Sequence, residues 1–191
     1  YETVYDQLYI SSNGMITLGS ADNEYANTNI PNLAMPNNFI APFWDDLGVG
    51  STYNSGKVYT KMVDTGTEKY FIVEWWQISR LSSTDLLTFE VVLYQNGNIL
   101  MQYQTANGVV TSATVGIEDA RGSDGLQYLY NTSGITANKA IKFTFPAPRA
   151  RVLLDKKIAG QFPGGNDTVS FTITVTNTGN LGTDIHKITT A

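Results

Sequence analysis

Short runs in which apolar and polar residues alternate recur along this chain, and no stretch shows a sustained helical period. In Thr88–Tyr94, for example, Phe89, Val91 and Leu93 fall on one side of an extended chain. A period of two with one apolar face is what a sheet packed against a second sheet requires. Threonine is abundant and favours strands, while asparagine and the 17 glycines favour tight turns. We therefore expect an all-β protein, an antiparallel two-sheet β-sandwich of jelly-roll type.

Turn signals separate the strand-like runs. Asn13-Gly14, between Leu8–Ser11 and Met15–Leu18, best fits a type I′ hairpin turn. Asn96-Gly97-Asn98 predicts a second hairpin, between Thr88–Tyr94 and Ile99–Tyr103. A long loop is expected from Gly19 to about Pro42. The remaining strands are predicted at Lys57–Val63, Tyr70–Ile78, Thr111–Glu118, Leu126–Tyr130 and Ala140–Phe145.

A domain boundary is predicted near Pro146 and Pro148, because two prolines interrupt a strand ladder and the charge changes sign there. Residues 1–147 are net acidic and residues 148–191 net basic. The second part holds strand-like runs at Arg151–Lys157, Val169–Asn177 and Ile185–Thr189. Three strands are too few to close a sandwich. We therefore expect this part to be an incomplete module.

An incomplete sandwich exposes strand edges that a neighbouring subunit can fill. The alternating run offers Val169, Phe171, Ile173 and Val175 for such a strand exchange, and a head-to-tail contact would produce a filament. The alternative is that the chain is a fragment of a longer multidomain protein. Because it begins with Tyr1, we expect it to be a processed or trimmed piece.

Composition excludes several classes of function. The absence of cysteine excludes disulfides and thiolate metal sites, and the single histidine excludes multi-histidine sites. A net charge of −5 disfavours nucleic acid as a partner, and no apolar run is long enough to span a membrane. No catalytic motif is present, and no spacing selects Asp45 with Glu74 or Glu90 as a glycoside-hydrolase pair, so we expect no enzyme.

Asp45 and Asp46 directly follow a run of large apolar residues that ends in Phe43-Trp44. A carboxylate in such surroundings needs hydrogen-bond donors or a cation. It either accepts backbone N–H bonds at a structural corner or helps to bind Ca²⁺, which takes oxygen ligands from loops. No cofactor is certain and calcium is the candidate. Further candidate calcium ligands are Asp22, Glu24, Glu118, Asp119 and Asp124. For Glu118-Asp119 the alternative is a local ion pair with Arg121.

Trp75 and Trp76 are adjacent on one predicted strand and must point to opposite faces. One is expected in the core, and the other is a candidate platform on which a sugar could stack. Asn131-Thr132-Ser133 and Asn166-Asp167-Thr168 are glycosylation sequons, so Asn131 and Asn166 are candidate modification sites.

Residues 7–145 resemble the nidogen-like extracellular β-domain of secreted and surface-attached bacterial and archaeal proteins. Four segments carry the resemblance: Tyr9–Gly19, Ile40–Leu47, Phe89–Gly97 and Ala113–Glu118. Residues 150–191 resemble the opening part of an Ig-like surface-protein repeat of unknown function. This second likeness is carried by Lys156, Pro163-Gly164 and the segment Thr168–Gly179.

Both resemblances imply an extracellular, cell-surface location and a non-catalytic role in structure, adhesion or filament assembly. The implied partners are other surface proteins or copies of the same chain. The alternative function is a carbohydrate-binding module whose exposed aromatic residues bind glycans.

Overall fold

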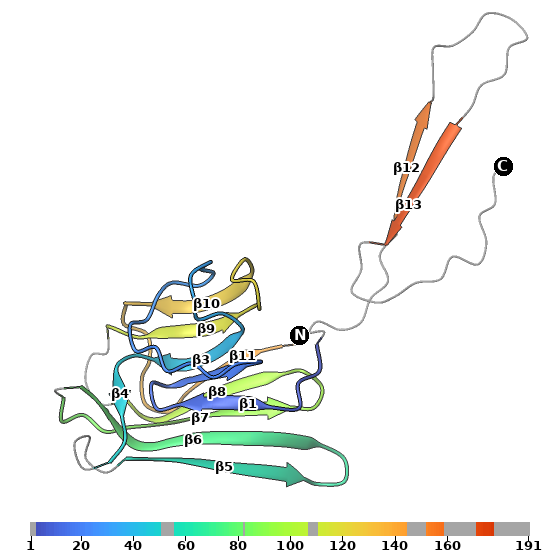
Figure 1. Ribbon diagram of the computed structural model, residues 1–191. Helices are drawn as coiled ribbons and strands as arrows, with labels where there is room; N and C mark the ends of the chain where they lie inside the picture. The colour runs from blue at the N-terminus through green and yellow to red at the C-terminus, as the bar shows by residue number, and fades with distance from the viewer. Residues whose placement is uncertain are drawn as a thin grey trace, which may run out of the picture. The chain divides into compact units, whose positions relative to one another are not determined.

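The computed structural model describes residues 3–50, 56–81, 83–106, 111–144, 152–158 and 171–177 (Figure 1). The chain divides into two compact units, Tyr1–Phe145 and Pro146–Ala191. The described residues form strands and turns but no helix, which confirms the expected all-β class. Within these ranges there is accordingly no helix with the length and apolar character needed to cross a membrane.

Two antiparallel sheets form the first unit in a sandwich-like arrangement (Figure 1). The five-stranded sheet has the order β1-β2-β3-β9-β10. Its strands are β1 (Leu8–Ser11), β2 (Met15–Leu18), β3 (Phe39–Trp44), β9 (Thr114–Glu118) and β10 (Gly125–Tyr130). The six-stranded sheet has the order β11-β8-β7-β6-β4, and β5 also pairs with β6. Its strands are β4 (Leu47–Gly48), β5 (Lys57–Asp64), β6 (Lys69–Arg80), β7 (Leu87–Tyr94), β8 (Ile99–Ala106) and β11 (Lys139–Phe143).

The main hydrophobic core lies between the two sheets. Alternate residues of both sheets enter it, which is the period-two pattern that the sequence predicted. Its centre is aromatic: the Trp75 ring stacks on Phe89 at 5.1 Å between centroids, and Phe43 of the other sheet stacks on Phe89 at 5.4 Å. Trp75 also donates its indole N–H to the Ser11 carbonyl at 2.9 Å, so its one polar atom is satisfied.

The predicted loop that ends near Pro42 is too long, because β3 begins at Phe39 and contains Pro42. Proline is tolerated in a sheet interior only where the ladder is interrupted. Here the pairing of β3 with β9 shifts register between Ala41 and Trp44, so Pro42 lies at that irregularity. Tyr103 donates a hydrogen bond from its hydroxyl to the Pro42 carbonyl at 2.6 Å, which ties β3 to the facing sheet.

The chain crosses from one sheet to the other at Asp45-Asp46. β3 belongs to the five-stranded sheet, and β4 pairs with β6 in the six-stranded sheet. The turn between β1 and β2 packs against this crossing. Asn13 accepts the Asp45 N–H at its carbonyl (3.3 Å) and the Leu47 N–H at its side-chain oxygen (3.1 Å). Two of the segments that carry the family resemblance therefore contact each other.

The expected type I′ turn at Asn13-Gly14 is wrong. Ser11 pairs with Met15, so the connection has three residues, Ser12 to Gly14. Gly14 has a φ of 70°, whereas Asn13 is not among the residues with positive φ. A type I′ turn needs positive φ at both central residues, and a three-residue loop needs it only at the last.

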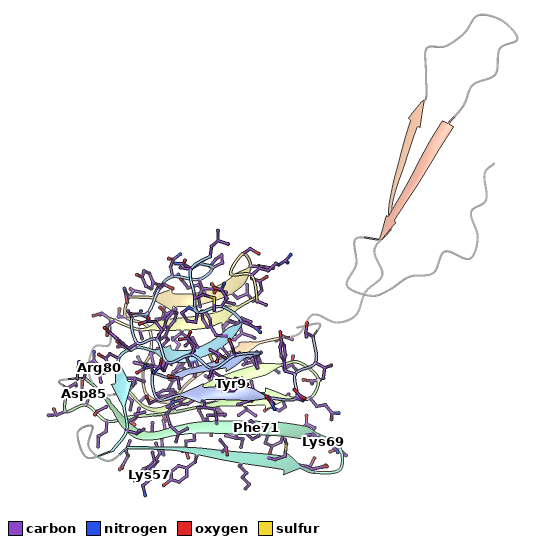
Figure 2. The ribbon with its side chains drawn as sticks, viewed as in Figure 1. Tyr9, Lys57, Lys69, Phe71, Arg80 and Asp85 are labelled. Atoms are coloured by element: carbon purple, nitrogen blue, oxygen red, sulfur yellow. The ribbon has the colours of Figure 1, made fainter. Side chains whose placement is uncertain are left out.

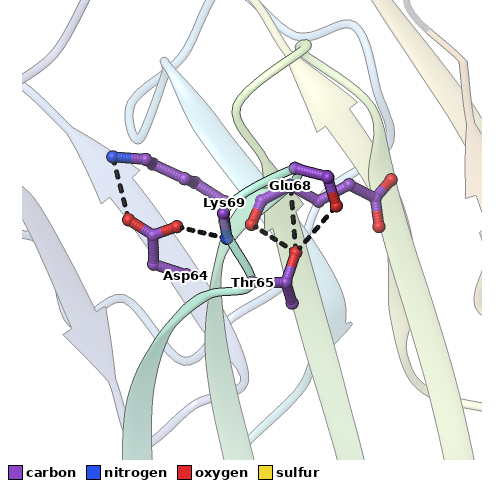
Figure 3. A network of polar contacts seen from close by, with 6 residues as sticks. Asp64, Thr65, Glu68 and Lys69 are labelled. Carbon is purple, nitrogen blue, oxygen red and sulfur yellow. Dashed lines mark hydrogen bonds and ion pairs between the residues drawn. The ribbon is translucent and has the colours of Figure 1, made fainter.

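The turn between β5 and β6 is exposed, unlike the buried turn between β1 and β2 (Figure 3). Thr65 and Glu68 exchange hydrogen bonds across it, and Lys69 pairs with Asp64 at 2.9 Å. Both charged side chains are about half exposed, so the ion pair contributes little to stability.

The long segment between β2 and β3 covers the side of the five-stranded sheet that faces away from the main core. Ile30 from this segment joins a second buried cluster with Met15, Phe39, Ala41 and Trp44. The Trp44 indole N–H donates to the Glu24 carbonyl at 2.9 Å and fixes the segment to the sheet.

In the second unit, β12 (Val152–Ile158) pairs with β13 (Phe171–Asn177) in a two-stranded antiparallel sheet. The predicted strands at Arg151–Lys157 and Val169–Asn177 overlap these two, although Arg151, Val169 and Ser170 lie outside the described residues. The predicted strand Ile185–Thr189 and the proline-rich boundary lie outside the described residues.

Candidate functional site

The six-stranded sheet has a side that faces away from the core, here named the outer face. It is defined by Tyr59 of β5, Glu74 and Trp76 of β6, Glu90 of β7, and Gln102 and Gln104 of β8. Strand register brings these residues together, since Tyr59 pairs with Glu74, Glu74 with Glu90, and Glu90 with Gln102. Directly paired residues share one face of a sheet. One row across four strands therefore carries an aromatic ring, two carboxylates and an amide.

Two aromatic side chains lie at one end of this row. Trp76 is 37% exposed and Tyr59 is 46% exposed. Their ring centroids are 6.4 Å apart and the rings meet edge to face at 65°. Such a pair is held by its own contact while it still presents aromatic surface to the solvent.

The carboxylates of the outer face lie beside a hollow of about 490 Å³. Its polar lining includes Glu74, Thr88, Glu90, Gln102, Gln104 and Asn138. Partial burial raises the pKa of Glu90, and the neighbouring charge of Glu74 raises it further. Like charges directly opposite each other in a sheet are destabilising, so this pair is not explained by stability alone.

Two irregularities in strand pairing border this hollow. The β6–β7 register shifts between Trp75 and Ile78, and the β7–β8 register shifts between Thr88 and Phe89. At the first, Gln77 has a φ of 48°, and its N–H donates to the Thr88 hydroxyl at 3.1 Å. A non-glycine residue in this conformation is strained by roughly 1 kcal/mol. Bulges of this kind redirect side chains and are frequent beside functional sites.

Asp45 takes part in a network at the crossing between the sheets. Its Oδ1 accepts the N–H of Asp46 at 2.9 Å, and its Oδ2 accepts the Ser112 hydroxyl at 2.6 Å. Arg80 donates to Ser112 at 3.4 Å and pairs with Asp85 at 3.1 Å (Figure 2). This is the arrangement of the structural alternative, in which the Asp45 carboxylate fixes the corner after Trp44.

The other candidate calcium ligands of the long loop bind backbone groups nearby. Asp22 accepts the Glu24 N–H at 2.7 Å. Glu24 Oε1 accepts the N–H groups of Tyr25 (2.9 Å) and Ala26 (2.8 Å). These bonds shape the loop locally.

Asp119 organises the turn between β9 and β10. Its Oδ1 accepts the N–H groups of Ser123 (2.9 Å) and Asp124 (3.1 Å), and its Oδ2 pairs with Arg121 at 3.3 Å. The predicted ion pair with Arg121 is therefore confirmed. The backbone N–H of Asp124 lowers the pKa of Asp119 the most, and Ser123 and Arg121 lower it further.

Among the described residues, no three acidic or histidine side chains converge as a metal-binding group. The structure does not bring Asp45, Asp46, Asp22 and Glu24 together with Glu118, Asp119 and Asp124 into such a group. Calcium binding stays a prediction.

Glu118 fixes the loop that covers the five-stranded sheet. Its Oε2 accepts the Asn32 N–H at 2.7 Å. Asn37, with its amide nitrogen turned toward the surrounding carbonyl groups, donates to Oε1 at 3.1 Å. The residue is 7% exposed, and burial raises its pKa to about 7, with the Asn32 N–H opposing and the Asp119 charge adding to the rise.

Stability is expected to depend on pH through Glu118. Because its pKa is higher in the folded state, the fold holds this proton where the unfolded chain does not. Protonated Glu118 therefore stabilises the fold. This stabilisation is fully present below pH 4.5, the ordinary pKa of a glutamate, and is lost as the pH rises through the folded-state pKa of about 7. Over that range the wild type should lose about 1–3 kcal/mol relative to Glu118→Gln. Urea unfolding at each pH measures this difference. Glu68→Gln, in the exposed β5–β6 turn, is the control, and parallel profiles for wild type and Glu118→Gln would contradict the assignment.

The remaining candidate residues are distributed over both units. Trp75 is fully buried and Trp76 is 37% exposed, so the expected division between core and surface is confirmed. Asn131 is exposed and accepts a hydrogen bond from Asn27 at 2.9 Å. Phe171, Ile173 and Val175 lie on β13, and Val169 and Asn166 lie outside the described residues.

The sequence did not reveal the grouping of Glu74, Glu90 and Gln102 with Tyr59. Each lies on a different strand, and only the cross-strand register places them in one row. The available signal was weak: charged or amide residues at alternate positions of runs that are otherwise apolar.

A protein-family model described as NIDO related matches residues 1–155. The match covers the first compact unit and extends through Asp155, within β12. No match was found among curated proteins or among solved structures.

Proposed function

The chain belongs to the NIDO-related family, and from this premise we propose that it is a non-catalytic extracellular module that mediates adhesion in a cell-surface structure. The family indicates an extracellular setting. The observation that supports adhesion most directly is the outer face, with its half-exposed aromatic residues beside a polar hollow.

The two sheets differ in how their outward sides are covered. The segment that contains Ile30 covers the outward side of β2 and β3, whereas the outer face of the other sheet exposes Tyr59 and Trp76. Val92 also points to the outer face, yet it is only 4% exposed and belongs to neither core cluster. Its register partners Ile72 and Leu100 flank it. Half-exposed aromatic rings beside polar groups suit recognition of a partner.

The arrangement of the carboxylates favours binding over hydrolysis. A glycoside hydrolase flanks the scissile bond with two acids, one of which protonates the leaving oxygen, while the other activates an attacking water on the opposite face of the sugar ring or itself attacks the anomeric carbon. Glu74 and Glu90 are direct register partners and project from one sheet surface. A ligand on that surface would meet both from the same side, so we propose binding without chemistry.

Adhesion can be tested with microbeads that carry the full chain. We expect the beads to attach to intact cells with a glycan coat, and we expect Gln102→Arg together with Gln104→Arg to reduce attachment at least tenfold, since these bulky cations would cover the hollow. Leu33→Arg with Met35→Arg, at exposed positions of the loop on the other sheet, should leave attachment unchanged. Coated beads that attach no better than bare beads would overturn the proposal.

A second candidate is assembly with copies of the same chain by strand complementation. The observation behind it is the two-stranded sheet of β12 and β13, in which each strand has one partner within the described residues. Two strands alone are marginally stable and leave open edges. Size-exclusion chromatography with light scattering over a range of concentrations tests this candidate, and a monomer at every concentration would remove it.

A further inference from the structure

The chemistry of the outer face restricts the class of ligand that it can bind. Trp76 follows Glu74 by two residues on the same side of β6, and Tyr59 is the register partner of Glu74. The aromatic surface and the polar hollow are therefore neighbours. Sugars combine an apolar ring face, which stacks on tryptophan, with hydroxyl groups at the ring edge that donate hydrogen bonds.

The hollow offers acceptors for such hydroxyl groups. Within the described part of the chain, Glu74, Glu90 and Gln102 make no side-chain hydrogen bond or ion pair to another residue. Lys139, which also lines the hollow, donates its amine to the Gly134 carbonyl at 2.7 Å and lies over the Tyr128 ring. The charged group of Lys139 is therefore already engaged elsewhere. The carboxylates of Glu74 and Glu90 remain available to a ligand.

Charge on the outer face disfavours a strongly charged ligand. Glu74 and Glu90 lie at the hollow, and three lysines project from flanking rows, because Lys57 pairs with Trp76, Lys61 with Ile72 and Lys142 with Leu100. An acidic sugar in the hollow would meet the two carboxylates. A cationic ligand that extends over the rim would meet the lysines. A neutral ligand avoids both repulsions.

We propose that the outer face binds a neutral oligosaccharide, with one sugar ring stacked on Trp76 and the hydroxyl groups of the next sugar hydrogen-bonded to Glu74, Glu90 and Gln102. The hollow of about 490 Å³ is of the size that holds a small ligand. The site rests on the proposed adhesive function and gives it a ligand class. The strained bulge at Gln77 in β6 lies beside the hollow, and its N–H donates to the hydroxyl of Thr88, which lines the hollow.

Isothermal titration of the full chain with neutral oligosaccharides of glucose, mannose, galactose and N-acetylglucosamine tests this proposal, with oligogalacturonate as the acidic comparison. We expect at least one neutral series to bind and oligogalacturonate to bind at least tenfold more weakly. Affinity should change less than about twofold between low and high salt, because no net charge is neutralised.

Variants locate the site. Trp76→Ala should weaken binding at least tenfold, with Trp76→Phe in between, and Glu74→Gln and Glu90→Gln should each weaken it several-fold. Tyr25→Ala, at another exposed aromatic residue, and Glu68→Gln are the matched controls and should bind like the wild type. Equal thermal unfolding of wild type and Trp76→Phe separates lost binding from lost folding.

The outcomes distinguish this site from the adhesive function. Bead adhesion without binding of any neutral oligosaccharide overturns the ligand class and leaves the function standing. If oligogalacturonate binds more tightly than the neutral sugars, or if affinity falls steeply with salt, the neutral ligand class is overturned in favour of an acidic polymer that binds to the lysines. Full affinity in Trp76→Ala overturns the location. If the wild type shows neither bead adhesion nor sugar binding, both proposals are overturned.

Discussion

Replacing Gly14 with alanine is expected to destabilise the first unit by at least about 3 kcal/mol, which corresponds to a fall in Tm of roughly 10 °C. Gly14 has a φ of 70°, and a Cβ at this position would overlap the Phe43 carbonyl. The same carbonyl group belongs to the strand that leads into the Asp45 crossing, and Phe43 donates its N–H to the Gly14 carbonyl at 3.2 Å. The backbone cannot move away without breaking this contact between the two segments.

Gly66→Ala is the matched control for that variant. Gly66 also has a positive φ, 85°, but nothing lies within 4 Å of the position its Cβ would take in the exposed β5–β6 turn (Figure 3). Gly66→Ala should therefore lose only about 1 kcal/mol of stability, which is the conformational cost of placing alanine at a positive φ. Urea denaturation of the two variants measures the difference, which isolates the steric overlap. Similar losses in both would show that the close approach of Gly14 to Phe43 has no energetic consequence.

Strands are the part of the fold that could be predicted from the sequence. Alternation placed Phe89, Val91 and the other core residues of β7 on one side, because a half-buried strand must separate apolar from polar residues residue by residue. Local turn chemistry was less decisive. Asn13-Gly14 fits two turn types, and the buried contacts of Asn13 with Asp45 and Leu47 belong to the three-residue form. Tertiary contacts of this kind are invisible in a local pattern.

The limits of strand β3 show a second kind of failure. Pro42 indicates a break in a ladder, and the prediction extended the loop through it. In the fold the break is a local shift in pairing with β9, and the strand continues to Trp44. The candidate site could not be predicted in full from the sequence for a related reason. Trp76 could be identified as one of two candidates, whereas its neighbours Tyr59 and Glu90 come from other strands, and register decides which residues meet.

Trp44→Ala is expected to cost about 3–5 kcal/mol, because it removes a fully buried ring and the anchor of the covering loop. The ring packs edge to face on Phe39 at 5.2 Å between centroids, and its N–H holds the Glu24 carbonyl. Trp44→Phe keeps an aromatic ring and loses the hydrogen bond, so its loss should be smaller, about 1–2 kcal/mol. Chemical denaturation of the three proteins measures the series.

Hydrogen exchange adds a local measurement to that series. The N–H groups of Ile30 and Asn32 bind the side chains of Gln127 and Glu118, so they report whether the loop stays on the sheet. In Trp44→Ala they should exchange faster than the amides of the central strand β7, because the loop opens before the sandwich unfolds. Trp76→Ala, which removes a half-exposed indole from the other sheet, should cost less than about 1 kcal/mol and leave the two amides protected. Equal effects of the two tryptophan variants would mean that the Trp44 cluster does not hold the loop, and that the polar contacts of Asn32 and Ile30 suffice.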